Sequence, residues 1–166
     1  MFPTLYKSPF ATAPGSVLQW GQIDRKVIHL QDYIHTVQYY ETDQMGFVHH
    51  SNYIRWFEEA RMDLLDQLGL PYAAMEEKGF LSPVLEVRCR YKQAARFGEA
   101  VAIQARLTEF GNVRYRLSYT VRDRNTGVLR AEGESEHCFI NREGRPIALK
   151  RHDPELAQRL LDAVEP

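Results

Sequence analysis

The sequence contains few cysteines and almost no net charge. Cys89 and Cys138 are the only two cysteines among 166 residues, which excludes a disulfide scaffold and a zinc site made of cysteines alone within one chain. The 21 lysines and arginines nearly cancel the 22 aspartates and glutamates. Nucleic-acid-binding proteins usually carry a strong basic excess, so we expect no nucleic-acid partner.

Long apolar runs and nucleotide motifs are missing as well. No stretch approaches the ~20 apolar residues that a membrane-spanning helix needs, and the first residues lack the basic and apolar regions of a secretory signal. The sequence has no G-x-G-x-x-G motif, no Walker loop and no H-E-x-x-H motif. We therefore expect a cytoplasmic protein with no cofactor, no metal and no stable membrane insertion.

The composition is that of one folded domain. Hydrophobic residues make up 44% of the chain, enough for one substantial core. Prolines punctuate the first part of the chain and predict an extended arm over residues 1–30. We expect a single domain over residues 31–150. A C-terminal helix should follow over residues 151–166, with Asp153 as its cap and Pro154 in its first turn.

The hydrophobic pattern predicts a strand, continuous or interrupted, over residues 27–40, then a polar loop and an amphipathic helix. Apolar residues recur along that helix at three- and four-residue spacing: Tyr53, Phe57, Ala60, Leu64 and Leu68. We expect Ser51 or Asn52 to cap its start and, of Glu58 and Glu59, one side chain to face inward and the other to face solvent. A short helix should follow over residues 72–78.

After Gly79 the period of the pattern changes to two. Four alternating runs are joined by short turns with glycine or asparagine, which predicts an antiparallel meander of four consecutive strands. The one long helix has an apolar face that needs a sheet to cover it. An α+β arrangement, with an antiparallel sheet curled around that helix, satisfies this need.

The polar loop before the helix carries the candidates for chemistry. Asp43 lies in a turn, Gly46 permits a ligand to approach the backbone closely, and His50 stands at the start of the helix. Backbone N–H groups at a helix N-terminus can stabilise a carbonyl oxygen that gains negative charge, and a nearby carboxylate can act as a base. The combination favours acyl transfer to water, although an aspartate or histidine at such positions most often serves only as a turn or capping residue.

Basic residues gather on two predicted strands in spite of the neutral total. Arg88, Arg90 and Lys92 share one strand face, and Arg114 and Arg116 share another. Arginine suits phosphate because its planar fork donates two hydrogen bonds, so these faces could hold the phosphates of a substrate such as coenzyme A. The other interpretation is an ordinary solvated sheet face.

The segment from Tyr39 to Arg61, YYETDQMGFVHHSNYIRWFEEAR, resembles the signature of the 4-hydroxybenzoyl-CoA thioesterase family, and most closely its Tol-Pal-associated branch. The resemblance extends from about Ile34 to Ile147. It implies a hotdog fold, an antiparallel β-sheet wrapped around one long central α-helix. It also implies an acyl-CoA thioester hydrolase that forms a homodimer or homotetramer with active sites between protomers. This sequence departs from the family pattern at Glu41, where many members carry aspartate, and at Phe47 and His49.

The resemblance also assigns roles to single residues. Asp43 matches the catalytic aspartate, acting as general base or as nucleophile, and His50 matches a histidine that we expect to assist it. The expected substrate-binding residues are Gly46, Val48, Tyr53, Glu58, Arg90 and Arg114. Two alternatives stay open: a hotdog dehydratase, and a non-catalytic protein that binds acyl-CoA or an acyl carrier.

Overall fold

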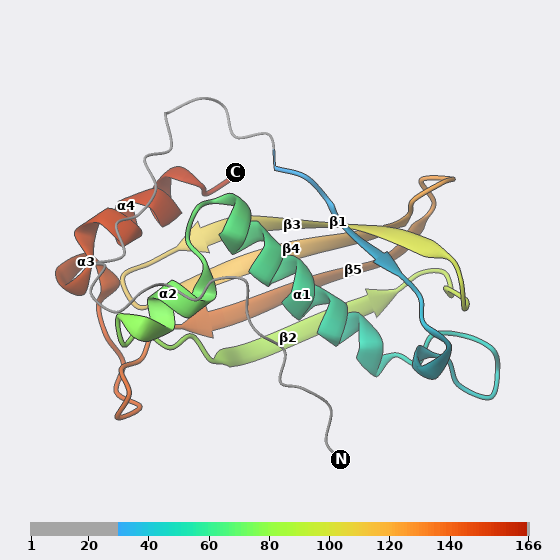
Figure 1. The fold of residues 1–166 in the computed structure, drawn as a ribbon, viewed down its shortest axis with the longest axis horizontal. Helices are drawn as coiled ribbons and strands as arrows, with labels where there is room; N and C mark the ends of the chain where they lie inside the picture. The colour runs from blue at the N-terminus through green and yellow to red at the C-terminus, as the bar shows by residue number, and fades with distance from the viewer. Residues whose placement is uncertain (1–29, 166) are drawn as a thin grey trace, which may run out of the picture.

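Helix α1 crosses one face of a five-stranded antiparallel sheet (Figure 1). This is a computed structural model, and it describes residues 30–165, so the predicted arm lies outside the described residues apart from its last position. The elements are, in chain order, β1 (Tyr33–Thr36), the 3-10 turn η1 (Tyr39–Glu41), α1 (Ser51–Gln67), α2 (Tyr72–Glu77), β2 (Val84–Tyr91), β3 (Ala100–Phe110), β4 (Arg114–Asp123), β5 (Leu129–Cys138), α3 (Leu149–His152) and α4 (Pro154–Asp162). The predicted α+β arrangement is confirmed.

The order of the strands in the sheet is β1-β3-β4-β5-β2, and every neighbouring pair is antiparallel. The predicted meander of four strands is therefore wrong in one respect. Strands β3, β4 and β5 do form a meander, but β2 pairs with β5, at the edge of the sheet opposite β1. The alternation of β2 indicates a strand, yet it carries no information about which neighbour that strand pairs with.

The predicted strand over residues 27–40 is interrupted in the part that the structure describes, residues 30–40. There β1 covers Tyr33–Thr36, and the chain then turns into η1. The carboxylate of Glu41 accepts a hydrogen bond from the backbone N–H of Gln38 at 2.7 Å, and this contact closes the 3-10 turn. A run of β-favouring residues is thus interrupted by a side chain that satisfies the backbone locally.

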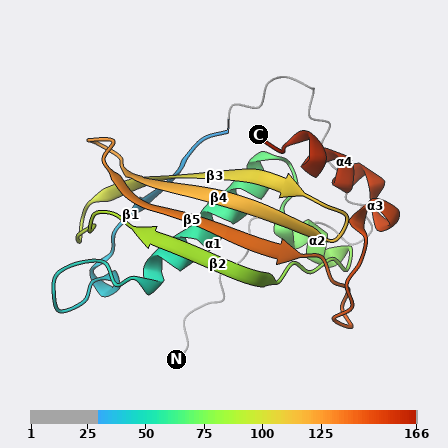
Figure 2. The same ribbon diagram turned by 180° about the vertical axis from the view of Figure 1, so that it is seen from behind.

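The apolar face of α1 forms the centre of the core. Trp56, Phe57 and Ala60 are at most 2% exposed, and the ring of Phe57 stacks on that of Tyr119 of β4, with centroids 4.4 Å apart. The helix ends at Gln67 and is followed by Gly69 at a φ of +69°, a conformation that glycine adopts without steric cost. Figure 2 shows the opposite face of the sheet, which no helix of the described chain covers.

The C-terminal helices pack on the same core. The side chain of Asp153 accepts a hydrogen bond from the N–H of Leu156, and Pro154 occupies the first turn of α4, which confirms the predicted cap. Leu156 and Leu160 are buried in the cluster that contains the apolar residues of α1. The short helix α3 was not predicted, because four residues are too few to show a helical period.

Gly133 in β5 is a position where any side chain should be destabilising. A Cβ atom there would lie 2.2 Å from Cε2 of Phe57 and 2.8 Å from the carbonyl oxygen of Arg88. We expect Gly133→Ala to lower the free energy of unfolding by about 2–3 kcal/mol, because the overpacked ring of Phe57 must move. Urea denaturation of Gly133→Ala and of the wild type tests this, and equal midpoints would contradict it.

Candidate active site

The loop between η1 and α1 is a closed, hydrogen-bonded turn. A bridge joins Thr42 to Val48, and the N–H of Asp43 donates to the carbonyl oxygen of Phe47 at 2.8 Å. Gly46 has a φ of +74°, and its N–H donates to the carbonyl oxygen of Asp43 at 2.9 Å. The glycine is thus required by the turn itself, in addition to any part in ligand approach.

The side chain of Asp43 is half-buried in this turn. Its Oδ1 accepts a hydrogen bond from the N–H of Met45 at 2.8 Å, which holds the carboxylate in one orientation. Among residues 30–165 the second oxygen, Oδ2, has no hydrogen bond assigned to it. Asp43 therefore combines an anchored carboxylate with an oxygen that a water molecule can reach.

The N-cap residue of α1 contributes no side-chain cap. His50 occupies this position with helical φ and ψ, its side chain makes no capping hydrogen bond, and the first turn contains no acidic residue. The residue before it, His49, accepts from the N–H of Ser51 through Nδ1 at 3.4 Å and from the N–H of Asn52 through its carbonyl oxygen at 2.9 Å. The predicted capping by Ser51 or Asn52 is therefore wrong. The hydroxyl of Ser51 contacts Nδ1 of His49 at 2.8 Å, and the amide of Asn52 donates to the carbonyl oxygen of Glu41 at 2.8 Å. The positive end of the helix dipole is thus left without an anionic partner.

His50 lies exposed at this helix start, beside the last residue of β2. Its ring is 4.1 Å from the ring of His49 and 6.5 Å from that of Tyr91, measured between centroids. The hydroxyl of Tyr91 donates to the carbonyl oxygen of His50 at 3.1 Å. The structure thus brings both residues to the same end of α1, with Asp43 near the start of the loop and His50 at its end.

Two predicted substrate-binding residues form the buried floor of this region. Val48 is 7% and Tyr53 3% exposed, and the ring centroid of Tyr53 lies 5.2 Å from that of Tyr91. Burial raises the pKa of the Tyr53 hydroxyl, so this group stays protonated at neutral pH. Both residues can bound a pocket, and neither is a base.

Glu58 lies farther along α1 and contacts a buried cation. Its carboxylate accepts a hydrogen bond from Nε of Arg61 at 3.1 Å. Its side chain is 46% exposed and that of Glu59 is 45% exposed, so the prediction that one of the two faces inward is wrong. Glu58 is thus the exposed partner of Arg61, whose own side chain is only 2% exposed.

The predicted basic faces are balanced by acidic residues. Arg114 and Arg116 both contact Glu136, at 2.8 and 2.9 Å. Lys92 contacts Glu132 at 3.1 Å, and Arg88 pairs with Glu86. These pairs lie on the helix-free face of the sheet, where a shallow pocket is lined by Glu86, Arg88, Arg116, Glu134, Ser135 and Glu136. The faces are thus mixed in charge, which the sequence pattern of the basic residues alone did not indicate.

Arg90 and Arg114 occupy opposite ends of the sheet. Arg90 pairs in register with Glu132, near the start of β5, and Arg114 pairs with Cys138, at its end. Six residues of extended strand separate these two β5 positions, a span of roughly 20 Å. Only Arg90 therefore lies near the end of β2 that contacts His50. The structure does not bring Arg114 to the Asp43 loop of the same protomer.

Sequence reasoning missed a polar cluster buried under α1. Nη1 of Arg61 donates to the hydroxyl of Tyr115 at 3.0 Å, and this hydroxyl contacts that of Ser82 at 2.6 Å. The ring of His137 stacks on Tyr115 with centroids 4.8 Å apart. Burial, together with the positive charge of Arg61, lowers the pKa of His137 to about 4. Isolated polar residues on alternating strands give no signal of such a cluster.

His137 should make the fold sensitive to mild acid. Between pH 6.5, the ordinary pKa of histidine, and pH 4, the unfolded chain binds a proton that the folded chain does not, so stability falls as the pH drops through this range. We expect the free energy of unfolding to fall by roughly 2 kcal/mol between pH 7 and pH 5 on account of His137. Urea denaturation at both pH values measures this. A His137→Gln variant that loses as much stability as the wild type would contradict the assignment.

Within residues 30–165, no group of three or more His, Cys, Asp or Glu side chains could hold a metal ion. In the same part of the chain, none of the helices has the length and apolar character needed to cross a membrane.

Comparison with known proteins gives consistent matches. The sequence model of the thioesterase-like superfamily matches residues 37–160. A Bacillus subtilis protein named "Putative acyl-CoA thioesterase YneP" is 33% identical over 120 residues, which are 72% of this chain and 86% of that protein. The structure of a DHNA-CoA thioesterase from Staphylococcus aureus superimposes with a TM-score of 0.76 at 31% identity, covering 80% of this chain and 89% of that one.

A third match is the structure of BH1999 gentisyl-coenzyme A thioesterase. It superimposes with a TM-score of 0.67 at 25% identity and covers 78% of this chain and 98% of that one. These matches confirm the hotdog fold that the sequence resemblance implied. They agree in placing the chain among thioesterase-like proteins, at a broader level than the 4-hydroxybenzoyl-CoA branch.

Proposed function

The chain belongs to the thioesterase-like superfamily and is a thioester hydrolase, and we propose that it cleaves an acyl-CoA to a carboxylic acid and coenzyme A at the N-terminal end of α1. The observation that carries this proposal is a helix start without an acidic residue or an N-cap side-chain hydrogen bond, joined by a short loop to an anchored carboxylate whose second oxygen has no hydrogen bond assigned to it. The named relatives that act on acyl-CoA thioesters support the choice of substrate class.

The reaction that we propose uses both features. The thioester carbonyl oxygen lies at the N–H groups of the first turn of α1, which stabilise the negative charge that develops on it. Asp43 takes a proton from a water molecule as that water attacks the carbonyl carbon, or attacks the carbon itself to form an anhydride that water then hydrolyses. The tetrahedral intermediate collapses and expels the thiolate of coenzyme A. Because a thiol has a pKa of about 8.5, this leaving group needs little help from an acid.

His50 and Tyr53 complete the site in this proposal. His50 is exposed at the helix start, where its ring can orient the thioester or protonate the departing thiolate. The buried ring of Tyr53, together with Val48, bounds the space next to the carbonyl carbon. Glu58 lies two helical turns farther along α1, where we propose that it contacts the acyl group.

The site as we propose it is shared between two protomers. Val84, Leu85, Val87 and Tyr91 of β2 are 37–50% exposed. Val87 pairs with buried Ser135, and Tyr91 with buried Ala131, so both side chains point toward the α1 side of the sheet. The apolar strip of β2, which these four residues form, lies on an edge strand whose last residue, Tyr91, contacts the helix start. A second copy of the chain would cover this strip and pair the open edge.

Within one protomer we assign the phosphates of coenzyme A to Arg90 rather than Arg114, since Arg90 is next to Tyr91, which contacts His50. Arg90 lies opposite Glu132 on the helix-free face, so the nucleotide would pass around the β2 edge of the sheet to reach it. We expect the KM for an acyl-CoA to rise at least about threefold between 0.05 and 0.5 M NaCl, because salt screens exposed charges. The kcat should change little, since the phosphates bind the ground and transition states alike. Steady-state kinetics with acyl-CoA and with an acyl-pantetheine measure this. A salt effect of equal size on both substrates would contradict a phosphate contact.

The experiment that tests the proposed function is a hydrolysis assay with a panel of thioesters. The panel contains 1,4-dihydroxy-2-naphthoyl-CoA, gentisyl-CoA, 4-hydroxybenzoyl-CoA and straight-chain acyl-CoA esters, and the readout is free thiol. A hydrolase releases thiol from at least one member with turnover. A dehydratase would change a hydroxyacyl or enoyl chain without releasing thiol, and a binding protein would do neither. Either of these outcomes would overturn the proposal.

A further inference from the structure

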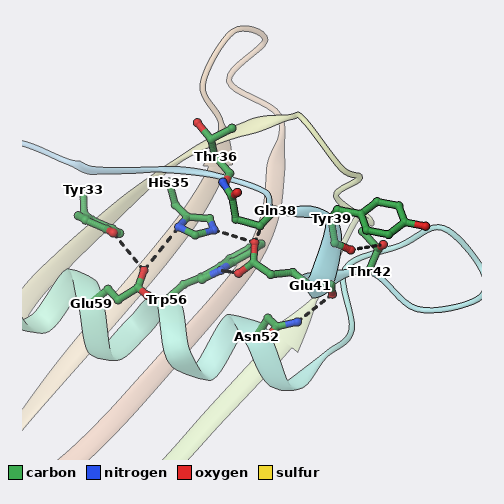
Figure 3. Close-up of polar contacts among 10 residues, drawn as sticks. All are labelled: Tyr33, His35, Thr36, Gln38, Tyr39, Glu41, Thr42, Asn52, Trp56 and Glu59. Carbon is green, nitrogen blue, oxygen red and sulfur yellow. Dashed lines mark hydrogen bonds and ion pairs between the residues drawn. The ribbon is translucent and has the colours of Figure 1, made fainter. Parts of the chain in front are cut away.

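The carboxylate of Glu41 is buried, and hydrogen bonds reach both of its oxygens from three elements (Figure 3). The residue is 4% exposed. Its Oε1 accepts from Nε1 of Trp56 on α1 at 2.7 Å. Its Oε2 accepts from the backbone N–H of Gln38 at 2.7 Å and lies 2.9 Å from Nε2 of His35 on β1. One side chain thus joins β1, η1 and α1.

The main chain of Glu41 joins the same hub to the Asp43 loop. The carbonyl oxygen of Glu41 accepts hydrogen bonds from the side-chain amide of Asn52 and from the N–H of His49, both at 2.8 Å. His49 lies just before α1, and Asn52 lies in its first turn. Asp43 follows Glu41 by two residues. Glu41 therefore contributes to the position of Asp43 relative to the first turn of α1, together with the contacts inside the loop.

We propose that Glu41 is a positioning residue for catalysis, which holds the Asp43 loop against the N-terminus of α1. In this position the carboxylate of Asp43 and the helix N–H groups can contact the same thioester. This inference rests on the proposed function. A displacement of about 1 Å of a catalytic group can cost as much as ~10²-fold in rate, so a tie of this kind has a measurable effect on kcat.

The chemistry of the hub requires an ionised carboxylate. Burial alone would raise the pKa of Glu41, but the hydrogen bonds from His35, Gln38 and Trp56 outweigh it and lower the pKa. A glutamine cannot replace it. Its amide N–H₂ would face either the N–H of Trp56 or that of Gln38, so that one of these two donors would lose its acceptor in either orientation.

Glu41→Gln is therefore the test variant, and Glu59→Gln is its matched control. Glu59 lies on the other side of His35, with its Oε2 3.5 Å from Nδ1 of His35 and 3.0 Å from the hydroxyl of Tyr33. It makes the same kind of contact with the same histidine but none with the Asp43 loop. We expect Glu41→Gln to lower kcat at least about tenfold while the KM changes less than threefold. Glu59→Gln should stay within twofold of the wild type in both constants.

A double-mutant cycle separates positioning from general damage. If Glu41 acts through Asp43, adding Glu41→Gln to Asp43→Asn should cost less than a further twofold, because the group that it positions is already lost. If Glu41 had a purely structural role, the fold-reduction of kcat in the double variant would be the product of those in the two single variants. Circular dichroism and thermal unfolding give the folded fraction by which each kcat is divided. Multiplicative losses, or a folded Glu41→Gln protein with wild-type kcat, would overturn the inference.

Trp56→Phe gives a second route if Glu41→Gln does not fold. This change removes the donor to Oε1 of Glu41 and reduces the ring that packs on His35 and Tyr53. We expect a kcat lowered about threefold or more, again without further effect in the Asp43→Asn background. An unchanged kcat in folded Trp56→Phe would overturn the inference on its own. Failure of the proposed function has a different signature: Asp43→Asn itself would then keep wild-type turnover, whatever Glu41→Gln does.

Discussion

Asp43→Asn is expected to lower kcat for acyl-CoA hydrolysis by at least ~10²-fold while the protein stays folded. Asparagine keeps an oxygen that can accept the hydrogen bond from the N–H of Met45, so the turn should keep its shape. The amide cannot take a proton from water and is a poor nucleophile, so the chemical step loses its base under either form of the mechanism.

The measurement is thiol release at saturating substrate, with circular dichroism to confirm the fold. Asp66→Asn is the matched control, because it makes the same change at an exposed position near the other end of α1; its kcat should stay within twofold of the wild type. A folded Asp43→Asn protein with near wild-type turnover would remove Asp43 from the mechanism and leave the helix start without its base.

Val87→Asp is expected to separate the protomers and abolish most activity. Val87 lies in the middle of the apolar strip of β2 and is 37% exposed. A partner chain that covers this strip would bury the new charge without a counter-ion, at a cost of several kcal/mol. Because the proposed site is shared, we expect kcat to fall at least ~10²-fold together with the loss of assembly.

Light scattering measures the assembly at micromolar concentration. The wild type should exceed the protomer mass of 19.3 kDa by a factor of two or four, and Val87→Asp should approach it. Val128→Asp provides the control, since Val128 is 39% exposed but lies in the turn between β4 and β5. A monomeric wild type that is active would contradict the shared site, and so would a monomeric, fully active Val87→Asp.

The sequence was sufficient for the parts of the fold that depend on local periodicity. The stripe through Tyr53, Phe57 and Ala60 predicted α1, and the pair Asp153-Pro154 predicted the start of α4; both are confirmed. Strand order was not accessible in this way. The pairing of β2 with β5 rather than β3 is a long-range choice, and the period of a strand is the same whichever neighbour it meets.

In the candidate site, too, the sequence predicted what is local in the chain and missed what depends on contacts between distant segments. Asp43, Gly46 and His50 lie within eight residues of one loop, so a sequence pattern could bring them together. Glu41 acts through partners on β1 and α1 that only the fold brings near it, and the sequence showed it only as a departure from a family pattern. The acidic partners of Arg114 and Arg116 were missed for a similar reason, because Glu136 belongs to a neighbouring strand.

The most direct test of the account is a crystal structure of the Asp43→Asn protein with a non-hydrolysable acyl-CoA analogue, in which a methylene group replaces the thioester sulfur. The account predicts that the carbonyl oxygen of the analogue lies within hydrogen-bond distance, about 3 Å, of the N–H groups in the first turn of α1. Its carbonyl carbon should face the side chain at position 43. An analogue bound on the helix-free face of the sheet, or with its carbonyl group away from the start of α1, would contradict the central claim.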